Sequence, residues 1–115
     1  MYWTNPIFFI LILSGPVVFI TGLILMIFPP KKINGIYGYR TPGSMKSQDR
    51  WDFAQKYSGK RLIQSGIILT LISFIGLLIK PIEGLGTVAG FGIMLIFTAV
   101  PIIQTENKLK KMDKL

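Results

Sequence analysis

The residues that could carry out chemistry are few, and they lie together in one polar segment, residues 29–61. Asp49 and Asp52 stand three positions apart and would share a helix face, as a mechanism with two carboxylates requires. The same pair near a helix N-terminus complements the helix dipole, and we favour that interpretation. The chain contains no histidine and no cysteine, which excludes imidazole catalysis, thiol nucleophiles, disulfides and Cys/His metal sites. We therefore expect no enzyme activity, no metal site and no cofactor.

A second candidate is the run GYRTPG at residues 38–43. Its glycines are too few and wrongly placed for a phosphate loop, and the Lys-Ser/Thr ending is missing. Two interpretations of Arg40 remain equally open. With Thr41 it could bind an anion, either a lipid phosphate or a carboxylate of a partner. Alternatively it could pair with Asp49 or Asp52 and cap backbone carbonyls, which would hold the loop against the rest of the chain.

The elements that must position this segment are three long stretches almost without charge, at about 6–28, 62–80 and 84–104. About 20 apolar residues in a helix cross a hydrocarbon core of about 30 Å. The first stretch follows five residues that carry no side-chain charge, so it does not resemble a secretory signal peptide. The sequence predicts an all-α integral membrane protein, with three transmembrane helices in a single membrane domain over residues 1–115.

The distribution of charge orients this predicted bundle. The formal net charge is +8, and the loop 29–61 holds eight Lys and Arg against two Asp, while the tail 105–115 adds four Lys against Glu106 and Asp113. By the positive-inside rule, the loop and the C-terminus are cytoplasmic and the N-terminus lies on the outer side of the membrane. Anionic lipids of the inner leaflet are the expected partners of these charges, and nucleic acid is not.

Small residues predict how the spans pack. Gly66, Thr70 and Ser73 form one face of the second span, and Gly86 with Gly90 forms a GxxxG pattern in the third. We favour packing within one chain; an oligomer through Gly86 and Gly90 is the alternative. No ionisable side chain lies in the interior of a span, which argues against an ion or proton carrier.

Within the loop, Ser44 can N-cap an amphipathic helix that runs to Tyr57, and Gly59 can end it or bend it into the second span. Such a helix would lie on the inner leaflet or fold back beneath the bundle. Its apolar sector contains Trp51, Phe53, Ala54 and Tyr57. The aromatic residues Tyr37, Tyr39, Trp51 and Tyr57 are explained as anchors at the membrane interface.

The run IYGYRTP at residues 36–42, followed by Ser44, Trp51, Ala54 and Gly59 before an apolar span, resembles the signature loop of the SdpI family. These bacterial membrane proteins are named for the immunity protein against the sporulation-delaying toxin. The resemblance covers essentially the whole chain, and the small size is similar to the stand-alone, YfhL-type members.

The resemblance implies a non-enzymatic role in immunity or resistance to a membrane-acting toxin peptide. It also implies signalling, in which a cytoplasmic regulator docks at the loop. The alternative is a structural or regulatory membrane subunit that binds another protein or anionic lipid and has no toxin role. The family's loop pattern implies six binding positions in this chain. They are Gly38, Arg40, Thr41, Pro42, Ser44 and Trp51.

Overall fold

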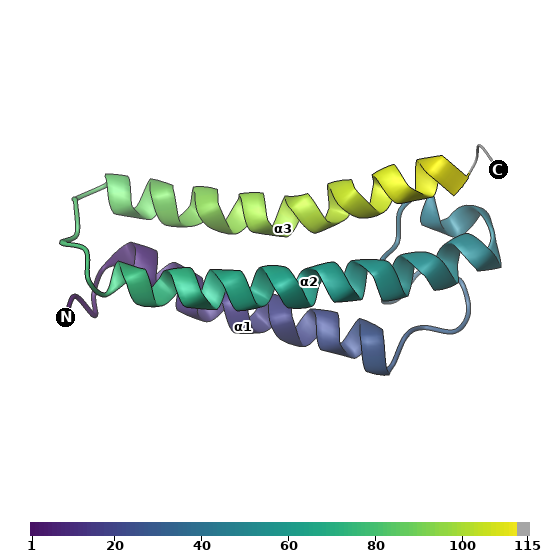
Figure 1. The fold of residues 1–115 in the computed structure, drawn as a ribbon, viewed down its shortest axis with the longest axis horizontal. Coiled ribbons are helices and arrows are strands. Elements are labelled where there is room, and N and C mark those ends of the chain that lie inside the picture. The colour runs from purple at the N-terminus through teal and green to yellow at the C-terminus, as the bar shows by residue number, and fades with distance from the viewer. Residues whose placement is uncertain (113–115) are drawn as a thin grey trace.

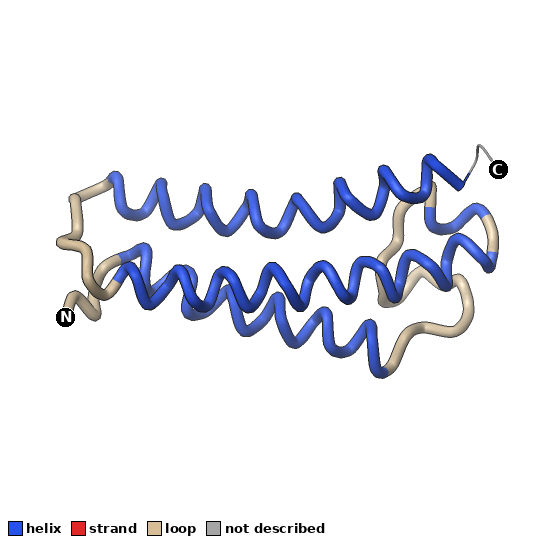
Figure 2. Tube along the Cα trace, viewed as in Figure 1, coloured by secondary structure: helices blue, strands red, loops and turns tan. Residues whose placement is uncertain are grey.

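Three long helices lie side by side in the computed structural model, which describes residues 1–112 (Figure 1). Helix α1 spans Pro6–Ile27, α2 spans Gln48–Gly76 and α3 spans Leu85–Met112, and a short 3-10 turn, η1, covers Ser44–Lys46. The bundle measures 50 × 26 × 20 Å. Within these described residues the chain forms only helices and loops (Figure 2). The predicted tail charges Asp113 and Lys114 lie outside the described residues.

Helix α1 begins at an asparagine that also ties it to α2. The Oδ1 atom of Asn5 accepts a hydrogen bond from the backbone N–H of Ile7 (3.1 Å), and Pro6 occupies the first helical position, where it loses no hydrogen bond. The fully buried Asn5 side chain donates to the carbonyl oxygens of Gly76 (2.7 Å) and Ile79 (3.0 Å). One side chain therefore caps α1 and satisfies two carbonyls, one at the last residue of α2 and one three residues beyond it.

The separate interfacial helix that the sequence predicted is not present. The Oγ atom of Ser47, rather than that of Ser44, caps α2, and the helix continues without a break past Gly59. The helix does not end at Gly59, because this residue packs directly against α1. A Cβ atom there would lie 3.0 Å from the carbonyl oxygen of Gly22 on α1. The amphipathic residues are thus the first half of α2.

Helices α1 and α2 approach closely through small residues, as helices that pack in lipid do. A Cβ atom on Gly15 would lie 2.8 Å from the backbone nitrogen of Thr70, and one on Gly22 would lie 2.6 Å from the carbonyl oxygen of Gly59. Gly66 likewise faces the backbone of Phe19. The small-residue face predicted for the second span packs within the chain.

The GxxxG pair of α3 also faces its own chain. Gly86 and Gly90 are buried, and a Cβ atom on Gly90 would lie 2.9 Å from the Cδ1 atom of Ile10. Gly86 lies against Asn5 and Pro6. An oligomer through these two glycines would have to replace this contact with α1.

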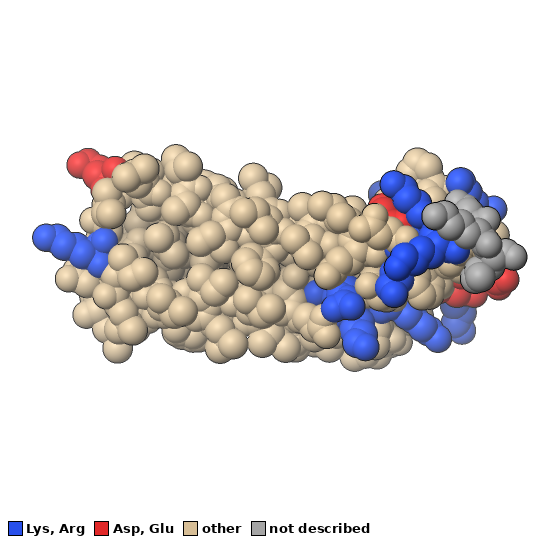
Figure 3. Space-filling model, turned by 45° about the horizontal axis from the view of Figure 1, so that its top comes forward, with Lys and Arg blue, Asp and Glu red and all other residues tan. Residues whose placement is uncertain are grey.

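The surface of the bundle indicates contact with lipid. Helices α1 and α3 are long and apolar enough to cross a membrane. In α2 the uncharged part of the helix runs only over residues 62–76, about 22 Å, which is short of a hydrocarbon core of about 30 Å. Large apolar side chains are exposed on all three helices, while most of the Lys and Arg side chains in view gather at one end (Figure 3). Exposed apolar area of this extent marks a surface that meets lipid or protein.

Candidate functional site

The loop that connects α1 to α2 is held against the first half of α2 by side-chain hydrogen bonds, one of them buried. The indole N–H of Trp51 donates to the carbonyl oxygen of Pro30 (2.7 Å), and Trp51 is fully buried. The exposed Gln48 side chain donates to the carbonyl oxygen of Lys31 (2.7 Å). Trp51 therefore anchors the loop to the helix, and its side chain is buried in the protein rather than exposed to lipid.

Gln55 holds the middle of the loop by both of its amide atoms. Its Oε1 atom accepts from the backbone N–H of Tyr39 (2.7 Å), and its Nε2 atom donates to the carbonyl oxygen of Tyr39 (2.8 Å). The side chain is fully buried, so both backbone groups of Tyr39 are satisfied away from water. Sequence reasoning did not assign Gln55 to the site. Its position four residues after Trp51, on the same helix face, was the available signal.

Glycine is required at position 38 for two reasons. The backbone φ angle of Gly38 is +107°, which L side chains rarely adopt. A Cβ atom there would also lie 2.6 Å from the Cγ atom of Pro30 and 2.8 Å from the Oε1 atom of Gln55. Gly38 lets the loop turn and pass directly over the buried amide.

Tyr39 connects the loop to the far end of α3. Its hydroxyl donates to the Oε1 atom of Glu106 (2.7 Å), and the carbonyl oxygen of Ile102 is 3.2 Å away. Burial raises the pKa of Tyr39 above its ordinary value, and the hydrogen bond to Glu106 raises it further. The phenol consequently stays protonated as a donor, and Tyr39 is buried rather than an interface anchor.

Thr41 and Ser44 close a tight turn through reciprocal hydrogen bonds. The backbone N–H of Thr41 donates to the Oγ atom of Ser44 (2.9 Å), and the backbone N–H of Ser44 donates to the Oγ1 atom of Thr41 (3.2 Å). The backbone N–H of Met45 donates to the carbonyl oxygen of Thr41 (3.1 Å). Ser44 is fully buried while Pro42, between these residues, is exposed. This pair resembles a helix capping box but forms η1 instead of a long helix.

The structure shows which group within the chain the Arg40 side chain contacts. Its Nη1 atom donates to the carbonyl oxygen of Gly35 (2.6 Å), so the guanidinium caps a backbone carbonyl and does not pair with Asp49 or Asp52. Asp52 accepts instead from Gln48 (2.8 Å), and Asp49 lies in the first turn of α2. Both carboxylates are exposed. The position of Asp49 fits its interpretation as a dipole complement, whereas Asp52 lies beyond the first turn.

The six predicted positions thus divide into two groups. Four of them build the loop: Gly38 passes over Gln55, Thr41 and Ser44 form the turn, and Trp51 anchors the start. Arg40 and Pro42 are exposed on its surface. Among residues 1–112, no three Asp or Glu side chains come close enough together to hold a metal ion. Hydrogen bonds to buried side chains therefore hold the loop in one conformation, and basic side chains are exposed on its surface.

An all-helical chain, with two helices able to cross a membrane and a loop bound to both α2 and α3, defines a small helical bundle of the membrane class. Residues 31–105 match the model of the SdpI/YfhL protein family. The chain belongs to this family, as its loop residues indicated.

A curated relative gives the same family assignment. The chain is 41% identical over 58 residues to a protein of Bacillus subtilis (strain 168) described as uncharacterized protein YfhL. The matched region covers 50% of this chain and 53% of that relative, so the chain spans about half of the relative's length. No solved structure matches the chain.

Proposed function

We propose that this chain is a non-enzymatic bacterial membrane protein that confers immunity or resistance to a membrane-acting toxin, with partner docking at the loop as its means of signalling. The observation that carries the proposal is the family match, which includes the whole of α2 and most of the loop. The fixed conformation of the loop supports the proposal, because a surface held by buried hydrogen bonds loses little entropy when a partner binds.

The proposed arrangement has three spans, with the N-terminus outside and the loop and C-terminus in the cytoplasm. The chain has no cysteine, so single cysteines at Ser47 and Glu83 can be labelled from either side of the membrane. Labelling of the two positions from opposite sides supports three spans. Labelling of both from the same side would refute that topology.

Protection is tested by expression in a strain that is sensitive to membrane-active toxins of this class. We expect survival with the native chain and reduced survival with Arg40→Ala, since Arg40 is exposed on the loop and its loss leaves the buried contacts intact. Lys80→Ala is the matched control, because Lys80 is an exposed cation outside the loop. Unchanged killing across a panel of such toxins, despite confirmed membrane insertion, would count against the proposal.

The alternative role, a structural or regulatory subunit without a toxin function, is favoured by one observation. Arg40 hydrogen bonds to a neutral carbonyl, so its charge remains available to a partner's carboxylate. A partner that co-purifies with the native chain but not with Arg40→Ala, in cells without toxin sensitivity, would support this role over immunity.

A further inference from the structure

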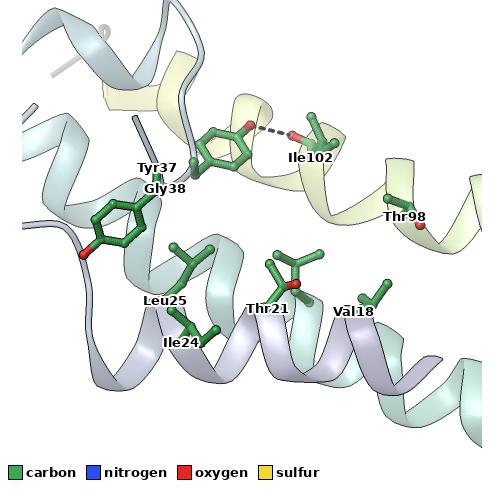
Figure 4. A pocket seen from close by; sticks show the side chains of 10 residues that line it. Val18, Thr21, Ile24, Leu25, Tyr37, Gly38, Thr98 and Ile102 are labelled. Atoms are coloured by element: carbon green, nitrogen blue, oxygen red, sulfur yellow. Dashed lines mark hydrogen bonds between the residues drawn. The ribbon is translucent and has the colours of Figure 1, made fainter. Parts of the chain in front are cut away.

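An apolar groove of about 460 Å³ opens between α1 and α3. The two helices meet where Gly90 contacts Ile10, and they diverge toward the end that bears the loop (Figure 1). They diverge because the last turns of α1 follow α2, against which Gly22 is packed. Val18 and Thr21 of α1 face Thr98 of α3 across the groove (Figure 4).

Two tyrosines of the loop close the polar end of this groove. The hydroxyl of Tyr37 donates to the carbonyl oxygen of Phe28 (3.3 Å), directly after α1, while that of Tyr39 donates to Glu106 on α3. The segment from Tyr37 to Tyr39 therefore crosses from one wall to the other and lines the groove itself (Figure 4).

The walls suit a purely apolar ligand. The hydroxyl of Thr21 donates to the carbonyl oxygen of Val17 (2.8 Å), and that of Thr98 donates to the carbonyl oxygen of Met94 (2.7 Å). Both hydroxyls are thus used inside their own helices, and the groove is lined mainly by carbon. A polar ligand would lose its hydration there without gaining hydrogen bonds.

The volume of the groove limits which apolar ligands can fit. A helix about 10 Å wide fills roughly 420 Å³ in each turn of 5.4 Å, so the groove would take little more than one turn of a peptide or of a second copy. A flexible hydrocarbon chain can occupy the same space along its length. An acyl chain of a membrane lipid is the occupant that the dimensions favour.

The positive charge of Arg40 near the closed end of the groove favours a lipid with an anionic headgroup. Arg40 directly follows the groove-lining Tyr39, and its side chain is exposed. Arg40 is oriented by the neutral carbonyl of Gly35 (2.6 Å), which leaves its positive charge available. Lipid phosphates lie at the depth where a membrane helix ends, and arginine binds them with charge-assisted hydrogen bonds.

We propose that the groove between α1 and α3 holds one acyl chain of an anionic phospholipid, with its phosphate bound at the Tyr37–Arg40 loop. The site requires the chain to be in a membrane and does not depend on toxin immunity.

The test is native mass spectrometry of the full chain, released from detergent after incubation with phosphatidylglycerol or with phosphatidylcholine of the same acyl chains. We expect one retained phosphatidylglycerol per chain. Val18→Trp fills the groove and should abolish retention, whereas Val17→Trp, at a neighbouring side chain that is 62% exposed, should not. Thr98→Trp with Leu95→Trp as its control repeats the comparison from the opposite wall, and helicity by circular dichroism confirms that each variant folds.

The headgroup contact has its own pair of variants. Arg40→Gln should lower the preference for phosphatidylglycerol over phosphatidylcholine by about tenfold, the effect of losing one charge-assisted contact, while Lys80→Gln should not change it. Excess inorganic phosphate should not displace the lipid. Equal retention in Val18→Trp and Val17→Trp, no preference between headgroups, or a dimer that Val18→Trp abolishes would each overturn the proposal.

Discussion

Replacing Gln55 by leucine is expected to release the loop from α2. Leucine fills a similar volume but leaves the backbone N–H of Tyr39 buried without the acceptor that it now has at 2.7 Å. The carbonyl of Tyr39 loses the amide donor at 2.8 Å and keeps the hydroxyl of Ser44 at 3.3 Å. Each buried polar group left unpaired costs about 1–3 kcal/mol. The carbonyl keeps one donor, and the burial of the additional apolar atoms recovers part of the cost, so we expect a net loss of about 2 kcal/mol.

Amide hydrogen exchange of Tyr39, measured by mass spectrometry on the protein in lipid nanodiscs, gives the most direct readout. A loss of about 2 kcal/mol in the closed state corresponds to exchange faster by roughly 30-fold. Exchange in the middle of α3 should not change, because the loop opens without unfolding the bundle. Global stability is followed in parallel by denaturant titration with circular dichroism.

The matched control is Gln48→Leu. Gln48 also makes two side-chain hydrogen bonds, to Lys31 and Asp52, but its side chain is exposed and water replaces both. We expect a change of less than about 0.5 kcal/mol. Equal effects of the two substitutions, or unchanged exchange at Tyr39 in Gln55→Leu, would refute the argument that burial makes these hydrogen bonds important.

Three further predictions concern the same loop. Gly38→Ala should destabilise the loop by about 2–4 kcal/mol through its positive φ and the contact with Gln55, whereas Gly35→Ala, with open space around it, should cost far less; denaturant titration compares them. Trp51→Phe should cost about 1–3 kcal/mol because the Pro30 carbonyl loses its donor, and the exposed Trp3→Phe should be near neutral in the same assay. Because the pKa of Tyr39 is higher in the folded than in the unfolded chain, its contribution to stability is complete below about pH 10 and declines at higher pH. Stability measured against pH should therefore fall less steeply above pH 10 in Tyr39→Phe than in the native chain, and equal slopes would contradict this.

Local composition was sufficient to predict most of the fold. The uncharged stretches predicted both ends of α1 and the start of α3 within one residue, because charge content is a property of neighbouring residues. Helix α3 continues eight residues past the predicted end at 104, into the charged tail. The loop pattern likewise indicated the family, which the match over residues 31–105 confirms. The predicted start of the second span at residue 62 was wrong, because a glycine such as Gly59 is typical of a helix end. Only the contact of Gly59 with Gly22 shows why the helix continues through this position.

The residues alone established that the chain is helical and apolar, that its basic charges are concentrated between and after its apolar stretches, and that Gly38 to Trp51 forms its distinctive segment. Only the tertiary structure decided which of these side chains build the loop and which are available to a ligand. Tyr39 and Glu106 are 67 residues apart, and Gln55 reaches Tyr39 across 16. Such contacts exist only once the helices have packed, because whether a polar side chain is buried depends on what the rest of the chain places over it.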